Sequence, residues 1–235
     1  TPKPSSAASD VYKRQVEACV VLEDDPVFNA GTGSVFRTDG SVHLDASIQT
    51  SEGKMGFVIA MEDTPNPIRV AADLLDEDIN GLTGEGARLW ADSKGFEKSK
   101  VQGRPPFEGA TDTVGVVARD SSGIIVCATS TGGTSNRPPG RVGDVPLPGC
   151  GFWVQDGIGV GATGIGEAIT RGMISLRVAD RILDGKDLEE SMIWALDECL
   201  EDGAEVGIIA LAAEGTGHGA SNSTNMPWSS WIARK

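Results

Sequence analysis

Two short apolar segments that flank a polar turn constrain the fold of this chain more than any other feature. Residues 114–118 and 124–129 are almost entirely apolar, and Asp120-Ser121-Ser122-Gly123 lies between them. Apolar runs of this length are typical of strands, and such a turn predicts a hairpin. Because neither run alternates with polar residues, we expect both strands to be central and covered on both faces.

Several other segments have the pattern of strands or helices. Strands are predicted at residues 34–37, 42–48, 57–61, 157–163, 206–213 and 219–222, the first two joined by Thr38-Asp39-Gly40. Helices are predicted at residues 16–22, 67–76, 84–93, 166–183 and 187–200. Asp187 and Glu190 have the spacing of a capping box at the start of the last helix. This order favours an α+β protein with packed sheets and helices outside them.

Composition narrows the class of protein. At 235 residues the chain can form one substantial domain, and its 34 acidic against 20 basic residues give a net charge of −14. This charge argues against nucleic acid and anionic membranes as partners. The four cysteines have no CxxC spacing, and no apolar run approaches the ~20 residues of a membrane span. We expect a cytoplasmic protein with reduced cysteines.

Two polar segments fall outside these patterns. Residues 1–15 are unpatterned and join abruptly to the apolar run at Val16, so we interpret them as a non-native or disordered leader to a single domain at 16–235. Residues 96–109 are charged and contain prolines, which is typical of an exposed linker.

Two familiar enzyme motifs are weakly supported. Residues 159–164 match GxGxxG after a predicted strand, but the chain has 31 glycines and a second helix follows instead of a strand. No GxSxG motif occurs, and the two histidines, His43 and His218, are expected to be structural.

An ordered series of motifs is more specific. They are LEDDPVFNAGTGS at 22–34, DTVG at 112–115, TSTGG at 129–133, GRVGD at 140–144, ATGIGE at 162–167 and MPW at 226–228. From Val16 to Lys235 the chain resembles the plant-type asparaginase/isoaspartyl peptidase family. The resemblance implies an Ntn-hydrolase fold, a four-layer αββα sandwich that here lacks the family's first strand and helix.

The resemblance also implies self-processing. The precursor would be cut between Asp112 and Thr113, giving subunits 1–112 and 113–235 that remain one domain. Thr113 would then be an N-terminal nucleophile whose own α-amine, with an ordinary pKa near ~8, serves as its base. Thr131 would orient or activate Thr113.

Other family roles fall on matching residues. Arg141 would bind the substrate α-carboxylate and Asp144 its α-ammonium, while Thr163 and Gly164 would form the oxyanion hole. Gly166 would let the substrate approach the backbone, and Asn29 would lie near the nucleophile. A sodium ion is implied at the backbone carbonyls of Leu22, Glu23, Asp25, Phe28, Ala30 and Thr32.

The implied activity is hydrolysis of L-asparagine and β-aspartyl dipeptides by a homodimer of processed units, without an organic cofactor. Asp144 favours the asparaginase and glycosylasparaginase branches over the threonine-aspartase branch, which carries Gln there. Thr131-Gly132-Gly133 favours asparaginase, whereas the turn at Thr163 is one residue shorter than in many asparaginases, as it is in glycosylasparaginases. An N4-glycosyl-asparagine hydrolase and a truncated, uncleaved, inactive precursor remain alternatives.

Overall fold

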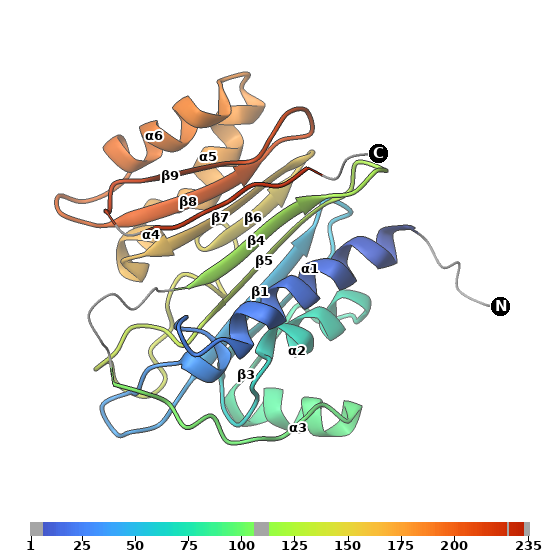
Figure 1. The fold of residues 1–235 in the computed structure, drawn as a ribbon, viewed down its shortest axis with the longest axis vertical. Helices are drawn as coiled ribbons and strands as arrows, with labels where there is room; N and C mark the ends of the chain where they lie inside the picture. Colours follow the sequence, from blue (N-terminus) through green and yellow to red (C-terminus); the bar gives the residue numbers. More distant parts are fainter. Residues whose placement is uncertain (1–6, 106–112, 225, 233–235) are drawn as a thin grey trace.

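The computed structural model describes residues 7–105, 113–224 and 226–232, and it is a mixed α+β structure with two sheets (Figure 1). The five-stranded sheet has the order β3-β2-β1-β5-β4 and the four-stranded sheet the order β6-β7-β8-β9. The strands are β1 (Leu44–Thr50), β2 (Met55–Met61), β3 (Gly81–Thr83), β4 (Val114–Arg119), β5 (Ile125–Thr131), β6 (Phe152–Gln155), β7 (Ile158–Gly164), β8 (Val206–Leu211) and β9 (His218–Ser221).

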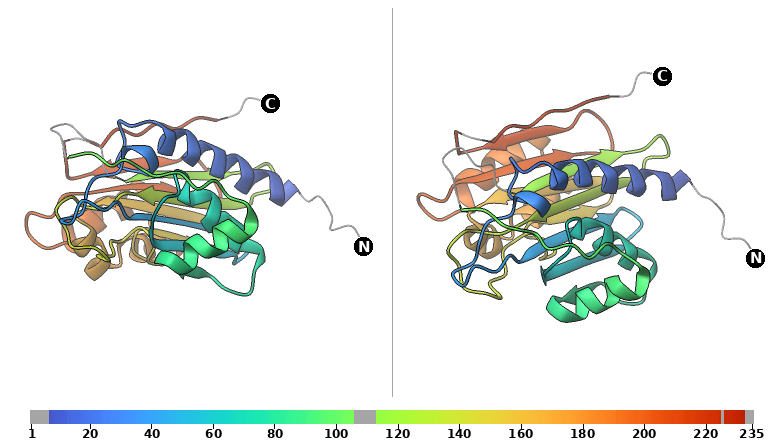
Figure 2. Two further views of the ribbon diagram at one scale, coloured as in Figure 1. Left: turned by 90° about the horizontal axis from the view of Figure 1, so that it is seen from below. Right: turned by 60° about the horizontal axis from the view of Figure 1, so that its bottom comes forward.

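Six α-helices lie in the described part of the chain, on the outer sides of the two sheets (Figures 1 and 2). Helices α1 and α2 contact the five-stranded sheet, whereas α5 and α6 contact the four-stranded sheet. The helices are α1 (Ala7–Asp24), α2 (Pro67–Asp73), α3 (Gly84–Lys94), α4 (Gly166–Gly172), α5 (Ile174–Leu183) and α6 (Leu188–Glu198), with short 3-10 turns η1 (Gly31–Gly33) and η2 (Leu74–Asp76).

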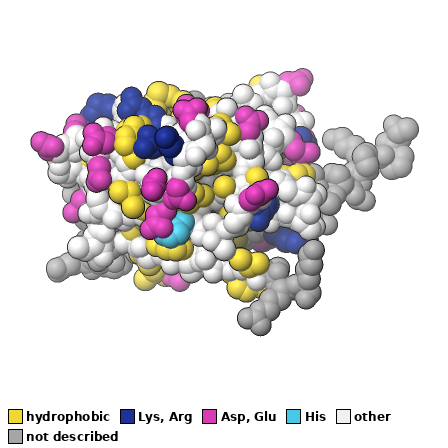
Figure 3. Space-filling model, turned by 90° about the horizontal axis from the view of Figure 1, so that it is seen from above, with side chains coloured by type: hydrophobic (Ala, Val, Ile, Leu, Met, Phe, Trp, Pro, Cys, Tyr) yellow, Lys and Arg dark blue, Asp and Glu magenta, His cyan; other side chains and the backbone are white. Residues whose placement is uncertain are grey.

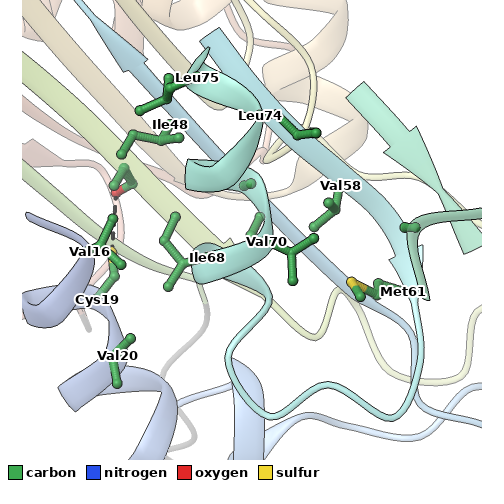
Figure 4. Packing of buried hydrophobic residues seen from close by; sticks show 14 of the residues in the cluster. Val16, Cys19, Val20, Ile48, Val58, Met61, Ile68, Val70, Leu74 and Leu75 are labelled. Carbon is green, nitrogen blue, oxygen red and sulfur yellow. Dashed lines mark hydrogen bonds between the residues drawn. The ribbon is translucent and has the colours of Figure 1, made fainter. Parts of the chain in front are cut away.

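Separate hydrophobic clusters hold these elements together. Between α1, α2 and the five-stranded sheet, Val16, Ile48 and Ile68 are buried, and Cys19 Sγ lies 3.7 Å from Ala128 O (Figure 4). A second cluster joins α5 and α6 to the four-stranded sheet. A third, which contains Ile125, Cys127, Phe152 and Val154, lies where the two sheets face each other. Each sheet therefore has two buried faces.

The structure confirms several predicted elements. The first predicted hairpin is β4 and β5, paired antiparallel from Val114 opposite Ser130 to Arg119 opposite Ile125. Helices α3 and α6 fall where they were expected, and α2 continues into η2 over the predicted range 67–76. Asp187 caps α6, since its Oδ1 accepts from Glu189 N at 2.9 Å and Glu190 N at 3.1 Å.

Other predictions were wrong. No strand forms at 34–37: Val35 makes an isolated bridge to Arg104, and Arg37 N already bonds Ser41 O in the following turn. The helix predicted at 166–183 is two helices, because Met173 has a left-handed φ of 45°. A side chain at Gly172 would lie 2.7 Å from Cys199 O, so the chain bends where it packs tightly.

The position of one predicted strand and the start of one predicted helix also differ from expectation. Strand β4 is the outermost described strand of its sheet, so the expectation of a central strand fails for it. Helix α1 begins at Ala7, and the boundary predicted after residue 15 therefore falls inside a helix. Gln15 is buried, and its Nε2 donates to Val116 O at 2.6 Å and Val126 O at 3.1 Å. Strands β3 and β6 were not predicted.

The surface agrees with the composition. Acidic side chains are spread over the face seen in Figure 3. None of the described helices is both long and apolar enough to cross a lipid bilayer.

Candidate active site

Strand register brings Thr113 and Thr131 together. The last β4–β5 pair joins Val114 to Ser130, so the half-buried Thr113, one residue earlier, lies opposite Thr131. A Cβ added to Gly115 would lie 3.3 Å from Thr129 Cγ2, on the side facing the second sheet. Since alternate residues of a strand share a face, the side chains of Thr113 and Thr131 are directed to the same space between the sheets.

Strand β7 brings Thr163 to that space from the other sheet. A Cβ added to Gly159 would lie 2.7 Å from Val117 Cγ1, and one added to Gly161 would lie 3.5 Å from Thr129 Cγ2. Successive residues of β7 therefore lie against successively earlier residues of β4, and Thr163 lies near the Thr113 end of that strand. Thr163 Oγ1 is buried without a hydrogen-bond partner in the described structure. Three hydroxyl side chains thus converge at one end of the two sheets.

The turn after β5 fixes the Thr131 side chain. Thr131 Oγ1 accepts from Gly133 N at 3.0 Å and lies 3.4 Å from Asn29 O, to which it can donate. The buried Asn29 side chain donates to Gly133 O at 2.6 Å and accepts from Val35 N at 3.1 Å. Asn29 therefore supports the turn that holds Thr131.

The loop at 136–144, here called the Arg141 loop, places two charged groups over α4. A Cβ added to Gly166 would lie 2.7 Å from Arg141 Nη2 and 2.9 Å from Asp144 Oδ1, so only glycine leaves this space open. Arg141 itself makes a bidentate pair with Glu167, with Nε to Oε1 at 3.1 Å and Nη2 to Oε2 at 2.9 Å. Asp144 Oδ2 is buried without a partner among the described residues.

Burial controls the charge of Asp144. The residue is 5% exposed, and burial raises the pKa of its carboxyl group to about 7, although its backbone N–H and Arg141 partly oppose that rise. Nearby Asp45 and Glu167 raise the pKa further. Asp144 can therefore exchange a proton near neutral pH, which an exposed aspartate does not do.

Sequence reasoning missed Asp45 and Arg37. Asp45 is fully buried in β1 beside Thr131, accepts from Ala60 N at 2.7 Å, and has a pKa raised by burial to about 6. The buried Arg37 donates from Nη1 to Thr134 O at 3.1 Å and from Nη2 to His43 O at 3.4 Å. The signal for Asp45 was a charged residue inside an otherwise uncharged strand segment.

Gly164 has a backbone conformation that suits glycine alone. Its φ is +130°, and an added Cβ would lie 2.2 Å from Glu205 O. The residue ends β7, directly after Thr163 in the chain. Asp112, the other half of the predicted cleavage site, lies outside the described residues.

The predicted sodium loop presents backbone oxygens around two glycines. Added Cβ atoms would lie 2.0 Å from Phe28 O at Gly33, and 2.6 Å from Glu23 O at Gly31. Two of the six predicted carbonyl groups, those of Phe28 and Glu23, therefore pack closely against glycines, where a larger residue would clash. Such oxygens suit a hard cation, although Leu22 and Glu23 still belong to α1.

The arrangement of two facing sheets with helices outside is consistent with an Ntn-hydrolase-like sandwich. A model of the asparaginase family matches residues 6–104 and 97–235. The chain belongs to this family, which confirms the resemblance inferred from its motifs.

Individual relatives agree with this membership. A plant-type L-asparaginase of Pyrobaculum calidifontis is 37% identical, and the match covers 77% of this chain and 69% of the relative. An isoaspartyl peptidase/L-asparaginase of Bos taurus is 36% identical, and the match covers 90% of this chain and 76% of the relative. A protein of the same name from Synechocystis is 32% identical, and the match covers 89% of this chain and 72% of the relative.

Proposed function

We propose that this chain hydrolyses the side-chain amide of L-asparagine and the isoaspartyl bond of β-aspartyl dipeptides, with Thr113 as the nucleophile. The observation that carries the proposal is the convergence of Thr113, Thr131 and Thr163 between the sheets, in a member of the asparaginase family. The names of the relatives support the substrate class.

Thr113 would first act on its own chain. Its hydroxyl attacks the Asp112 carbonyl carbon, the peptide C–N bond breaks, and the resulting ester is hydrolysed by water. The products are a carboxylate at Asp112 and a free α-amine at Thr113. Because β4 begins at Val114, a new terminus at Thr113 would leave the β4–β5 pairs intact.

In turnover the freed α-amine takes the Thr113 hydroxyl proton as Oγ1 attacks the substrate amide carbon. Thr131, fixed by its own turn, would orient that hydroxyl. The unpartnered Thr163 hydroxyl and the Gly164 N–H would donate to the oxyanion. Ammonia or an amino acid leaves with the proton, and water then hydrolyses the acyl ester to release aspartate.

Arg141 and Asp144 would recognise the amino-acid head group. Both meet over Gly166, where a side chain would intrude. A guanidinium binds a carboxylate bidentately, and an ionised Asp144 balances an ammonium group. A substrate without an ammonium group would leave the ionised, buried Asp144 without a partner, which disfavours ordinary peptide side chains.

We further propose the finer architecture. Helices outside two facing sheets support a four-layer αββα sandwich formed by one domain of two subunits, 1–112 and 113–235, which pairs into a homodimer. The chain would work in the cytoplasm without an organic cofactor. The backbone carbonyl groups of Leu22, Glu23, Asp25, Phe28, Ala30 and Thr32 would hold sodium, which would stabilise the loop that carries Asn29. Replacing sodium with choline should then lower the melting temperature.

The deciding experiment is intact mass after incubation, for the wild type beside Thr113→Ala and the matched change Thr111→Ala. Two fragments that divide between Asp112 and Thr113 are expected in the wild type and in Thr111→Ala, but not in Thr113→Ala. Cleaved protein is then assayed on asparagine, a β-aspartyl dipeptide and N4-glycosyl-asparagine. Activity on only the last would favour the glycosylasparaginase alternative, and a single uncut chain throughout would make this an inactive precursor.

A further inference from the structure

A histidine ring contacts the middle of the Arg141 loop. Three hydrogen bonds join this loop to residues 36–43, and the one closest to Arg141 runs from Gly140 N to His43 Nδ1 at 3.1 Å. The other two link backbone groups, Asn136 N to Phe36 O at 3.3 Å and Thr38 N to Arg137 O at 3.0 Å.

The geometry defines the protonation state of the ring. A backbone N–H can only donate, so Nδ1 must be the acceptor and the neutral ring carries its proton on Nε2. That nitrogen lies 3.3 Å from Ser41 Oγ and 3.5 Å from Glu62 Oε1. The residue is 8% exposed. His43 is therefore a fixed ring with an acceptor directed at the loop.

The Arg141 turn and the Asp144 end of the loop are held independently. Asp144 O accepts from Leu147 N at 2.9 Å and from Gly151 N at 3.0 Å, so the Asp144 end has its own backbone support. In the middle of the loop, Arg141 N donates to Pro138 O at 3.2 Å within the same turn that His43 holds through Gly140. Loss of the His43 contact should consequently disturb Arg141 more than Asp144.

We propose that neutral His43 is a positioning residue that holds the Arg141 loop in place for binding of the substrate α-carboxylate. This inference rests on the proposed function. A second proton on the ring would set Nδ1–H against Gly140 N–H, two donors facing each other, and the bond would be lost. Substrate affinity should then fall in acid, whereas the hydroxyl groups that perform the reaction are not touched.

The surroundings of His43 keep it neutral under ordinary conditions. Burial lowers the pKa of the ring below 6.5, and the nearby Arg37 guanidinium lowers it further. Glu62 and Asp39 favour the charged ring but do not reverse the direction. Release of the loop is therefore expected only below that pH.

The test compares His43→Ala with His43→Asn in the full chain. Asparagine Oδ1 can stand in place of Nδ1 and accept from Gly140 N, but it does not titrate. His218→Asn is the matched control, because it removes the other histidine, whose Nε2 faces Glu189 at 3.4 Å. Hydrogen exchange of residues 138–144 and the separate values of KM and kcat for asparagine are measured at pH 7.5 and pH 5.5.

Exchange in this segment should become faster in His43→Ala and stay near wild type in both Asn variants at pH 7.5. KM should rise about fivefold in His43→Ala with kcat little changed, a shift typical of one lost hydrogen bond. Acid should raise KM more in the wild type than in His43→Asn.

Unchanged exchange in folded His43→Ala would overturn the inference, as would equal losses in His43→Ala and His43→Asn. Exchange is measured without turnover, so the result does not depend on the proposed activity. An inactive wild type would count against the proposed function alone, and an active wild type with an unmoved KM in His43→Ala would count against the role of His43.

Discussion

The two halves of the candidate site are built differently. The nucleophile end consists of uncharged hydroxyl groups on Thr113, Thr131 and Thr163, placed by strand register. The head-group end consists of the half-buried Arg141 and the buried Asp144, placed by a loop. Register allows little adjustment, because a slip by one residue would turn each side chain to the opposite face.

This difference separates rate from affinity. Changes at the nucleophile end should alter kcat, because those groups interact with charge that develops during the reaction. Changes at the loop should alter KM and its dependence on pH, because the buried Asp144 carboxyl group titrates near neutral pH. At the nucleophile end the hydroxyl groups do not titrate, and protonation of the Thr113 α-amine should act on kcat.

The largest effect is expected for Thr163→Val. This change keeps the shape but removes the unpartnered Oγ1. Loss of one oxyanion donor should lower kcat by about 10²–10³ with KM nearly unchanged. Stability should hold or rise, since a buried polar atom without a partner is removed. Kinetics and thermal melting check both parts, with intact mass to confirm cleavage. A variant with the wild-type rate would remove Thr163 from the oxyanion hole.

The pH dependence of affinity should follow Asp144. Its carboxyl group has a pKa of about 7 and must be ionised to receive an ammonium group. Below pH 7, kcat/KM for asparagine should fall about tenfold per pH unit, whereas kcat should change less through this residue because bound ammonium keeps it ionised. Parallel curves for kcat and kcat/KM would instead assign the titration to a group that takes part in the chemical step, such as the α-amine.

Gly166→Ala should disturb binding without unfolding the chain. The new methyl group would lie under 3 Å from Arg141 Nη2 and Asp144 Oδ1, so these two side chains must move apart. KM should rise about tenfold, whereas the melting temperature should hold, because Ala suits a helix better than Gly. Gly86→Ala in α3 is the control, since its Cβ would meet nothing within 4 Å. Equal KM values in both variants would contradict a head-group site over Gly166.

The features that could be predicted from sequence are those that depend on neighbouring residues. Local patterns suffice for the β4–β5 hairpin and the Asp187 cap, since turn and capping chemistry depend on neighbouring residues. They fail at Met173, where packing of Gly172 against Cys199 O breaks a helix that periodicity would continue.

Recognition of the site residues depended on the motifs. Buried contacts between distant segments, such as Gly140 with His43, leave no local signal. Asp45 was missed for a related reason: its role depends on burial beside Thr131 and on charges from other segments, which the strand pattern does not contain.

Asp45 lies where the two halves meet, and Asp45→Asn tests which half it serves. The variant can still accept from Ala60 N, so kcat should hold, while KM rises about two- to threefold through the lost charge near Arg141 and Arg37. Burial raises the folded-state pKa above the unfolded value of 3.8 to about 6. The wild type therefore has its full stability from this group below 3.8 and loses it as pH rises through 6.

Asparagine at this position does not titrate. The free energy of unfolding of Asp45→Asn minus that of the wild type should therefore increase by roughly 1 kcal/mol from pH 5 to pH 7. Urea titrations at both pH values measure this difference, with exposed Glu52→Gln as a control for the loss of one negative charge. A drop in kcat at constant KM would instead assign Asp45 to the nucleophile end. Strand register would then position a charged group at that end in addition to the three hydroxyl groups.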